Sequence, residues 1–193
     1  MKVIIISGTP KTEGLCCTCI DAAKEGVERA GAECEVVSLS DYEIERCKLC
    51  ADGWGTCRSE HYCEFGSDGF DKIQKKLAEA DALILDTPVY WGEMTELMKA
   101  FFDRFRRCEA FRGDSGAVAG KYVLLIASPG GSGNGLISCL DQMDRLSRHL
   151  HTKIFDYVGV NRWNKGYKIP AITEAAAAMT KATIKAQAEK QGE

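Results

Sequence analysis

Four cysteines fall within one short segment of the sequence: Cys47, Cys50, Cys57 and Cys63. The first two form a Cys-x-x-Cys pair, which chelates metal readily because both sulfurs can face the same ion, and the other two can complete four ligands. The spacing departs from known classes, since a zinc ribbon needs a second close pair and a compact iron-sulfur motif has a third cysteine where Gly53 stands. The segment indicates redox or metal chemistry.

Three interpretations of this segment remain open. Its cysteines are ligands of an iron-sulfur cluster or another metal, or a redox-active thiol pair, or free thiols of a structural loop that packs beside another site. His61 is either a metal ligand or a histidine that faces solvent. Trp54 and Tyr62 either cover a cofactor or partner subunit or hold the loop in place.

The composition limits the classes of partner. A chain of 193 residues can bury one core, so we expect a single domain over residues 1–193 with a cysteine-rich loop at 40–67. The formal net charge of −3 and the absence of a lysine or arginine block argue against a nucleic acid or a membrane surface as partner. A small molecule is the expected partner.

The compartment is predicted from the apolar runs. The run that begins at Lys2 is too short for the core of a signal peptide, and no other stretch is long and apolar enough to span a bilayer. We therefore expect a cytoplasmic protein with reduced thiols. In that compartment ten cysteines do not form a disulfide framework, which favours the metal and redox interpretations.

Short apolar runs alternate with helical patterns along the chain. Five strands are predicted, at residues 2–7, 34–39, 82–87, 121–128 and 154–160. Five helices are predicted, at 15–30, 70–80, 93–107, 136–150 and from 172 onward. This alternation favours parallel strands joined by right-handed crossovers, which makes a three-layer, doubly wound α/β sheet. Ligands of such sheets bind beyond the carboxyl ends of the strands, so the loops after the first, third and fourth strands are the candidate site.

The loop after the first strand, residues 7–18, suits a phosphate. Its glycines let the backbone approach an anion, the start of the next helix offers free amides, and Thr9, Lys11 and Thr12 add donors. The loop lacks both the Gly-Lys-Ser/Thr ending of a triphosphate loop and the three-glycine dinucleotide fingerprint, so a monophosphate fits better. The alternative is a tight turn with a helix cap.

The other two loops suit a planar ligand. Tyr90 and Trp91 follow Pro88, which ends the third strand, and precede Gly92, which lets another group come close. The loop at 128–135 offers many unhindered amides. The alternatives are aromatics that pack in a core or an interface, and a flexible linker.

The order and spacing of these loops resemble the flavodoxin-like family of NAD(P)H-dependent FMN reductases and multimeric flavodoxin-type oxidoreductases, including its iron-sulfur flavoprotein-like branch. The resemblance covers nearly the whole chain and implies a strand order of 2-1-3-4-5. It rests on these motifs: Gly8-Thr9-Pro10-Lys11, Thr87-Pro88-Val89-Tyr90, Met98-Lys99 and Asp103-Arg104.

The resemblance implies FMN as cofactor, with its phosphate at the first loop and its ring system against the other two. The implied binding residues are Thr9, Pro10, Lys11, Thr12, Gly14, Leu15, Cys16, Pro88, Val89, Tyr90, Trp91, Gly92, Ser128, Pro129, Gly130 and Gly131. Leu15 and Cys16 stand where the family often has Asn and Thr, which removes two donors. Backbone amides, Thr12 or Thr18 then have to compensate.

The resemblance also implies the activity. We expect an FMN-dependent oxidoreductase that takes a hydride from NAD(P)H and passes electrons to an unidentified acceptor, with no catalytic side chain because the flavin carries the chemistry. The alternatives are an electron-transfer protein that relays electrons between protein partners through flavin and an iron-sulfur cluster, and a flavin-free interaction module. Related iron-sulfur flavoproteins carry a cysteine motif in the same loop, which implies [4Fe-4S] ligands at Cys47, Cys50, Cys57 and Cys63.

Two further expectations concern partners. Arg162, Lys165 and Lys168, beside Trp163 and Tyr167, either receive a nicotinamide phosphate or form an ordinary solvated loop. The family resemblance implies a homodimer or homotetramer in which the cysteine loop reaches the flavin of a neighbouring subunit.

Overall fold

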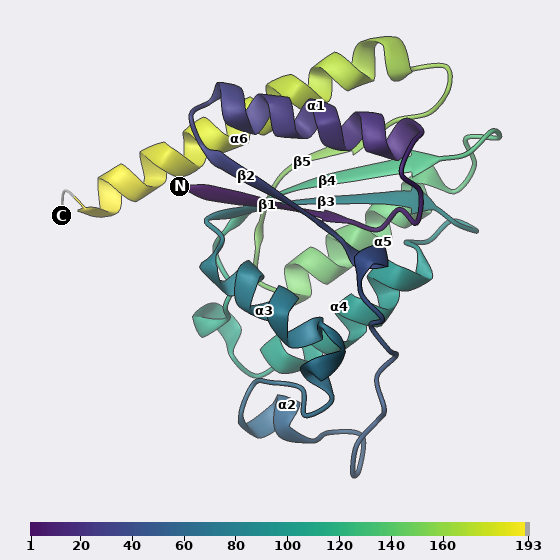
Figure 1. Cartoon of the computed structure of the whole chain (residues 1–193). Helices are drawn as coiled ribbons and strands as arrows, with labels where there is room; N and C mark the ends of the chain where they lie inside the picture. Colours follow the sequence, from purple (N-terminus) through teal and green to yellow (C-terminus); the bar gives the residue numbers. More distant parts are fainter. Residues whose placement is uncertain (192–193) are drawn as a thin grey trace.

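The computed structural model describes the fold of residues 1–191, in which five strands alternate with helices (Figure 1). The strands are β1 (Lys2–Ser7), β2 (Glu33–Ser38), β3 (Ala82–Val89), β4 (Tyr122–Pro129) and β5 (Lys153–Gly159). The α-helices are α1 (Leu15–Arg29), α2 (Thr56–Ser59), α3 (Phe70–Glu79), α4 (Glu96–Glu109), α5 (Leu136–His149) and α6 (Lys165–Gln191).

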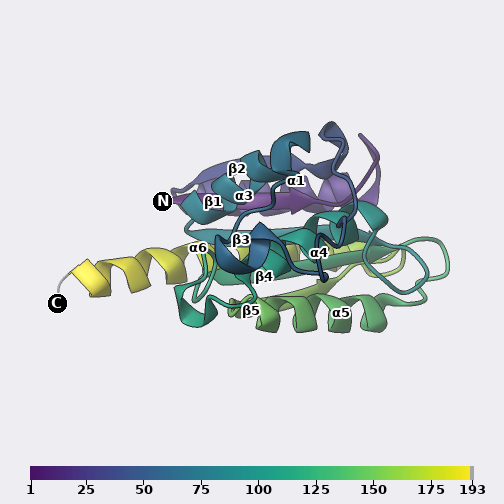
Figure 2. The ribbon, with the colours of Figure 1, turned by 90° about the horizontal axis from the view of Figure 1, so that it is seen from below.

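The strands form one parallel sheet with the order β2-β1-β3-β4-β5, which confirms the doubly wound sheet and the order that the resemblance implied. Helices α1 and α6 cover one face, and α3, α4 and α5 cover the other (Figure 1). Ser7 pairs with Asp86, so the carboxyl ends of β1 and β3 lie at the same end of the sheet, which we call the carboxyl edge. The loops after the strands gather there, at the end away from the N-terminus (Figure 2).

Each strand buries side chains on both faces, as the apolar runs predict. In β1, Ile4 and Ile6 pack beneath α3, α4 and α5, whereas Val3 and Ile5 pack beneath α1 and α6. Successive side chains of a strand point to opposite faces, so one run of six residues supplies both layers.

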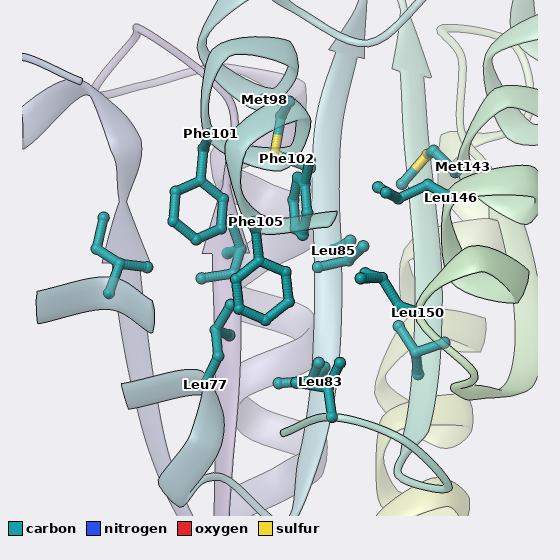
Figure 3. Close-up of a cluster of buried hydrophobic side chains, with 14 of the residues drawn as sticks. Leu77, Leu83, Leu85, Met98, Phe101, Phe102, Phe105, Met143, Leu146 and Leu150 are labelled. Atoms are coloured by element: carbon teal, nitrogen blue, oxygen red, sulfur yellow. The ribbon is translucent and has the colours of Figure 1, made fainter. Parts of the chain in front are cut away.

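Helix α4 contributes an aromatic face to the larger core. Phe101 and Phe105 are fully buried and stack with ring centroids 5.7 Å apart. They face Leu83 and Leu85 of β3, with side chains from α5 beside them (Figure 3). Full burial of one such side chain stabilises the fold by about 1.5–3 kcal/mol. The packing fixes α4 on the sheet and with it the first turn of α4, which lies at the carboxyl edge.

Most predicted boundaries agree with the structure within three residues, but α6 begins at Lys165 and not at 172. The reason is a turn that starts the helix: the Asn161 side-chain oxygen accepts the amide hydrogens of Trp163 and Asn164. Pro170 then lies inside the helix, near its start, where it removes a single backbone donor. The short helix α2 was not predicted.

Within residues 1–191, no helix has the length and apolar character that crossing a membrane requires.

Candidate functional site

The loop after β1 is held against β3 and the start of α4. The Gly8 amide donates to the Asp86 carbonyl oxygen over 2.8 Å, and the Thr95 hydroxyl donates to the Gly8 carbonyl oxygen over 2.9 Å. A Cβ atom at position 8 would lie 2.3 Å from Cγ of Met98. Only glycine lets the backbone pass this closely, so the loop enters the site in a fixed position.

Helix α1 starts without a side-chain cap. Gly14 precedes it with φ of +113°, and among the described residues no side chain bonds to the first-turn amides as a cap. The first amides of a helix lack partners within the helix, and the helix dipole adds positive potential there. The loop and the helix start together therefore offer an anion site at the carboxyl edge.

The side chains predicted to donate to this anion differ in their availability. Lys11 and Thr12 are exposed, so both can turn toward a ligand. Thr9 is buried, and its hydroxyl oxygen accepts from the Lys11 amide over 3.2 Å, which shapes the loop. Thr18 donates its hydroxyl hydrogen to the Gly14 carbonyl oxygen over 3.1 Å. The amides of residues 15 and 16 and the exposed Thr12 are therefore the better replacements for the two missing donors.

The loop after β3 is a tight turn that exposes an aromatic side chain. Tyr90 and Glu93 exchange two backbone hydrogen bonds of 3.0 Å. Between them, Trp91 adopts φ of +53°, which is unusual for a bulky residue, and its side chain is fully exposed. The exposed Trp91 indole and the half-exposed Tyr90 ring therefore lie at the surface of the carboxyl edge.

The loop after β4 closes on that turn through two glycines. A Cβ atom on Gly135 would lie 2.5 Å from the Cα of Gly92, and the Ser138 hydroxyl donates to the Gly92 carbonyl oxygen over 2.9 Å. Gly130 and Gly131 have open space where a side chain would point. The structure thus brings together the predicted residues of all three loops, and the third loop presents bare backbone to the edge.

A separate groove of about 600 Å³ runs between the first turns of α1 and α6. Its lining includes Leu15, Thr18, Arg162 and Lys165. Arg162 and Lys165, two members of the predicted basic cluster, therefore lie beside the loop after β1, which is the predicted phosphate loop. Trp163 packs elsewhere, against Gly133, where a Cβ atom would meet its ring at 2.8 Å.

A buried arginine of α4 binds the cysteine segment, residues 40–67. Arg104 is almost fully buried and forms a paired interaction with Asp68, with nitrogen–oxygen distances of 2.6 and 3.3 Å. It also donates to the carbonyl oxygens of Glu45 and Phe65, over 3.0 and 2.8 Å. Its guanidinium carbon lies 4.4 Å from the centre of the Phe70 ring. One side chain therefore joins both ends of the segment to the helix.

Aromatic side chains hold the middle of the segment. Trp54 packs edge-on against Phe111 with centroids 5.1 Å apart, and Arg107 lies over the Trp54 ring at 4.7 Å. The His61 ring nitrogen Nδ1 lies 3.1 Å from the Cys108 carbonyl oxygen at the end of α4. Among the two interpretations of Trp54, packing that holds the loop fits this geometry.

These contacts place most of the segment away from the carboxyl edge. Helix α4 starts at that edge and ends at the opposite one. Trp54 and His61 contact residues of its last turn, and Trp54 also contacts Phe111, the second residue after the helix. Helix α2 accordingly lies below α3 and α4, far from the sheet (Figure 1). Because the segment follows the second predicted strand, its place in the sequence predicts that it lies beside the carboxyl edge. That prediction is wrong for this part of it, because Arg104 and Arg107 bond the segment along α4.

The comparison with known families decides the classification. Residues 1–165 match the model of the NADPH-dependent FMN reductase family. The chain belongs to this family. Its flavodoxin-like fold is shared with RosB, solved with a bound 8-demethyl-8-formylriboflavin-5′-phosphate intermediate, at a TM-score of 0.77 and 17% identity over 98% of this chain and 81% of that one. An archaeal flavodoxin matches with a TM-score of 0.63 and 14% identity over 95% of this chain and 99% of that one.

A curated relative of this FMN reductase family member is an iron-sulfur flavoprotein of Methanocaldococcus jannaschii. The two are 39% identical over 106 residues, which are 55% of this chain and 52% of the relative. The chain spans about half the length of this relative and of other iron-sulfur flavoproteins that it matches.

The residues at the edge fit the cofactor of the FMN reductase family. The uncapped start of α1 suits a phosphate, and the bare backbone at Gly130 and Gly131 can approach a planar ring closely. Pro88 and Val89 are half-buried at the end of β3, and the buried Ser128 and Pro129 end β4 beside them. These positions form a continuous edge.

The cysteines fit a metal cluster less well. Within residues 1–191, no three His, Cys, Asp or Glu side chains lie close enough together to hold a metal ion. Cys50 interacts with Glu64 and Cys47, and burial first and then Glu64 raise its pKa. Cys57 and Cys63 interact with Cys108 of α4, whose pKa is about 12, mainly through burial.

Two residues of the edge had not been singled out from the sequence, Thr95 and Asp86, and Gly135 had been included only as the last residue of the loop at 128–135. Asp86 had a visible signal, because it is an acid within the apolar run of β3. Its carboxyl is fully buried, and burial raises its pKa well above the ordinary value. Thr95 had none, and nothing in the sequence marked the contact of Gly135 with Gly92, since these contacts join segments that are far apart in the sequence.

Proposed function

We propose that the protein is an FMN-dependent oxidoreductase that takes a hydride from a reduced nicotinamide and passes electrons to an acceptor. The observation that carries the proposal is the uncapped α1 start joined to the glycine-lined edge, in a chain of the FMN reductase family. FMN, when bound, supplies the hydride and electron chemistry.

The residues of this chain supply binding and orientation. The first-turn amides of α1 and the exposed Lys11 and Thr12 hold the phosphate. Thr95 fixes the carbonyl of Gly8 and so keeps the phosphate loop in place. The contact between Gly92 and Gly135 fixes the second loop against the third, which positions the ring. Preorganised groups of this kind lower the cost of binding.

The test is reduction of the FMN-loaded protein. The purified chain is incubated with FMN, freed of excess flavin and mixed without air with NADH or NADPH, and the flavin absorbance is followed. Bleaching by either nucleotide at a rate above that of free FMN supports the proposal. A protein that binds FMN but is not reduced by either nucleotide overturns the reductase activity.

That second outcome leads to the other candidate, an electron-transfer protein that relays electrons between protein partners. The exposed Trp91 and Tyr90 side chains support it, because aromatic groups at the flavin edge suit contact with a partner protein. The names of the iron-sulfur flavoprotein relatives also favour it. An iron assay on protein purified without air tests whether the four cysteines of this candidate hold a cluster.

The groove between α1 and α6 is the proposed place for the phosphate of a nicotinamide donor. Arg162 and Lys165 line it, and the first turn of α6 adds positive potential.

We also propose a homodimer or homotetramer. The exposed apolar side chains near the edge support this, including Ile137, Trp163 and Tyr167.

A further inference from the structure

Asp86 is a buried acid without a cationic partner among the described residues. Its side chain has no exposed area, and neither carboxyl oxygen has a hydrogen-bond partner among the described residues. Buried carboxylates are normally paired or hydrogen-bonded, because desolvation penalises the charged form. An orphaned acid in the third strand of the sheet therefore needs an explanation.

The position of Asp86 connects it to the phosphate loop. Its backbone carbonyl accepts the Gly8 amide, so it lies directly beneath the first residue of that loop. Its neighbours in the sheet are Ser7 of β1 and Ile126 of β4. Its side chain faces α1, where it interacts with the Cys16 thiol in the first turn of the helix.

The groups that face the carboxyl are all neutral in their ordinary states. From α1 they are the thiols of Cys16, Cys17 and Cys19, whose pKa values are raised mainly by burial and next by Asp86. From β4 the Ser128 hydroxyl lies 3.7 Å from the Cys19 sulfur. From β1 the Ser7 hydroxyl oxygen accepts the Thr9 amide over 3.4 Å. No basic side chain among the described residues forms an ion pair with Asp86.

Since no cation compensates it, burial of the carboxyl raises its pKa and so favours the neutral acid. An ionised Asp86 would place a negative charge beneath the same helix start that offers positive potential to an anion. We infer that Asp86 is a positioning residue of the phosphate loop: its neutral carboxyl leaves the α1 start free to hold a phosphate, and its ionisation expels that phosphate. This inference rests on the proposed function, because FMN supplies the phosphate.

The direction of the pH effect follows from linkage. The pKa of Asp86 is raised in the folded chain, so the unfolded chain loses this proton first as pH rises. Stability contributed by the neutral acid is present below the ordinary carboxyl range and is lost as pH rises toward the folded pKa. Phosphate binding favours the protonated acid, so by reciprocity deprotonation weakens phosphate binding.

The experiment compares FMN with riboflavin, which lacks the phosphate. Affinities of wild type and Asp86→Asn for both flavins are measured by fluorescence quenching from pH 6 to 10. For wild type, FMN affinity should fall by about tenfold for each unit by which the phosphate shifts the Asp86 pKa. FMN affinity of Asp86→Asn should stay level above pH 7, and riboflavin affinity should stay level in both proteins. Parallel FMN profiles in the two proteins would overturn the inference.

Three controls separate the causes. Asp21→Asn removes an exposed charge from α1 and should keep the wild-type profile. If Asp86→Asn does not fold, Asp86→Leu replaces it, with riboflavin binding as the check on folding. If wild type binds neither flavin at any pH, the proposed function itself has failed.

Infrared spectra at neutral pH give a readout that does not need flavin. A protonated-carboxyl band is expected in wild type and should be absent from Asp86→Asn. Absence of this band from wild type contradicts the inference.

Discussion

The carboxyl-edge loops and the cysteine segment are both long connections that follow strands, yet their polar groups are arranged in opposite ways. At the edge, the starts of α1 and α5 follow glycines and lack side-chain caps among the described residues. In the cysteine segment, Arg104 and Arg107 take up backbone carbonyl oxygens, and aromatic rings cover the middle.

This difference distinguishes a region that is arranged to bind a ligand from a region that is arranged to stabilise the fold. Backbone groups left without partners at an exposed edge are available to a ligand, and glycines let that ligand come close. Backbone groups already bonded to Arg104 and Arg107 stabilise the chain itself. The four cysteines attract attention in the sequence, but the segment that carries them has the contacts of a structural loop in the single chain.

The largest expected effect tests the structural role of the cysteine segment. Arg104→Ala leaves the Asp68 carboxylate and two carbonyl oxygens without their partner. Loss of one member of a buried ion pair costs about 3–5 kcal/mol, and we expect the free energy of unfolding to fall by that amount. Urea denaturation measures it, while FMN affinity of the folded fraction should be unchanged.

Arg106→Ala is the matched control, because Arg106 is partly exposed and lies 3.8 Å from Asp103 on the same helix. It should change the free energy of unfolding by less than about 1 kcal/mol. Equal losses in the two variants would contradict the anchoring role of Arg104.

The next effect tests the edge. Gly135→Ala places a Cβ atom 2.5 Å from the Cα of Gly92, at a φ of +77°. The two loops must separate, so FMN affinity should fall at least about tenfold, with a loss of stability of about 1–3 kcal/mol. Gly120→Ala has nearly the same backbone strain, at φ of +72°, but no atom within 4 Å of the new Cβ. It should lose stability but keep its FMN affinity, and a similar loss of affinity in both variants would rule out the loop contact as the cause.

A smaller effect concerns the hydroxyl that links the phosphate loop to α4. Thr95→Val removes the cap that accepts from the Met98 amide and the donor to the Gly8 carbonyl. The expected cost is about 1–2 kcal/mol, with a several-fold loss of FMN affinity because the loop is no longer held. Thr180→Val is the control, since that buried hydroxyl bonds only within α6. Thermal denaturation and FMN titration distinguish the two, and unchanged FMN affinity in Thr95→Val would contradict the link.

The smallest effect compares thiols from the two regions. Cys17 lies half-buried in the first turn of α1, and Cys47 lies half-buried in the cysteine segment. Bound FMN should slow alkylation of Cys17 several-fold, because the ligand covers that helix start, and should leave Cys47 unaffected. Mass spectrometry after timed alkylation measures both sites in one sample. Protection of Cys47 alone would place the flavin at the cysteine segment.

The sequence predicted the sheet and the three loops because their signals are local. Apolar runs, helical spacing and glycines mark β1, β3 and β4 and the turns that follow them. The course of the cysteine segment was not predictable, because it depends on Arg104 and Arg107, which lie about 40 residues or more further along the chain. The early start of α6 was missed because it depends on the turn in which the Asn161 side chain accepts the amide hydrogens of Trp163 and Asn164. The binding of an iron-sulfur cluster by the four cysteines stays a prediction.

The central claim is that the three loops bind FMN and that the cysteines are not needed for it. The most direct measurement is the FMN content and affinity of wild type and of a variant with Cys47, Cys50, Cys57 and Cys63 all replaced by serine, both purified without air. We predict one FMN per chain and equal affinity in the two proteins. Failure of wild type to take up FMN, or loss of FMN from the serine variant alone while it remains folded, would contradict the claim.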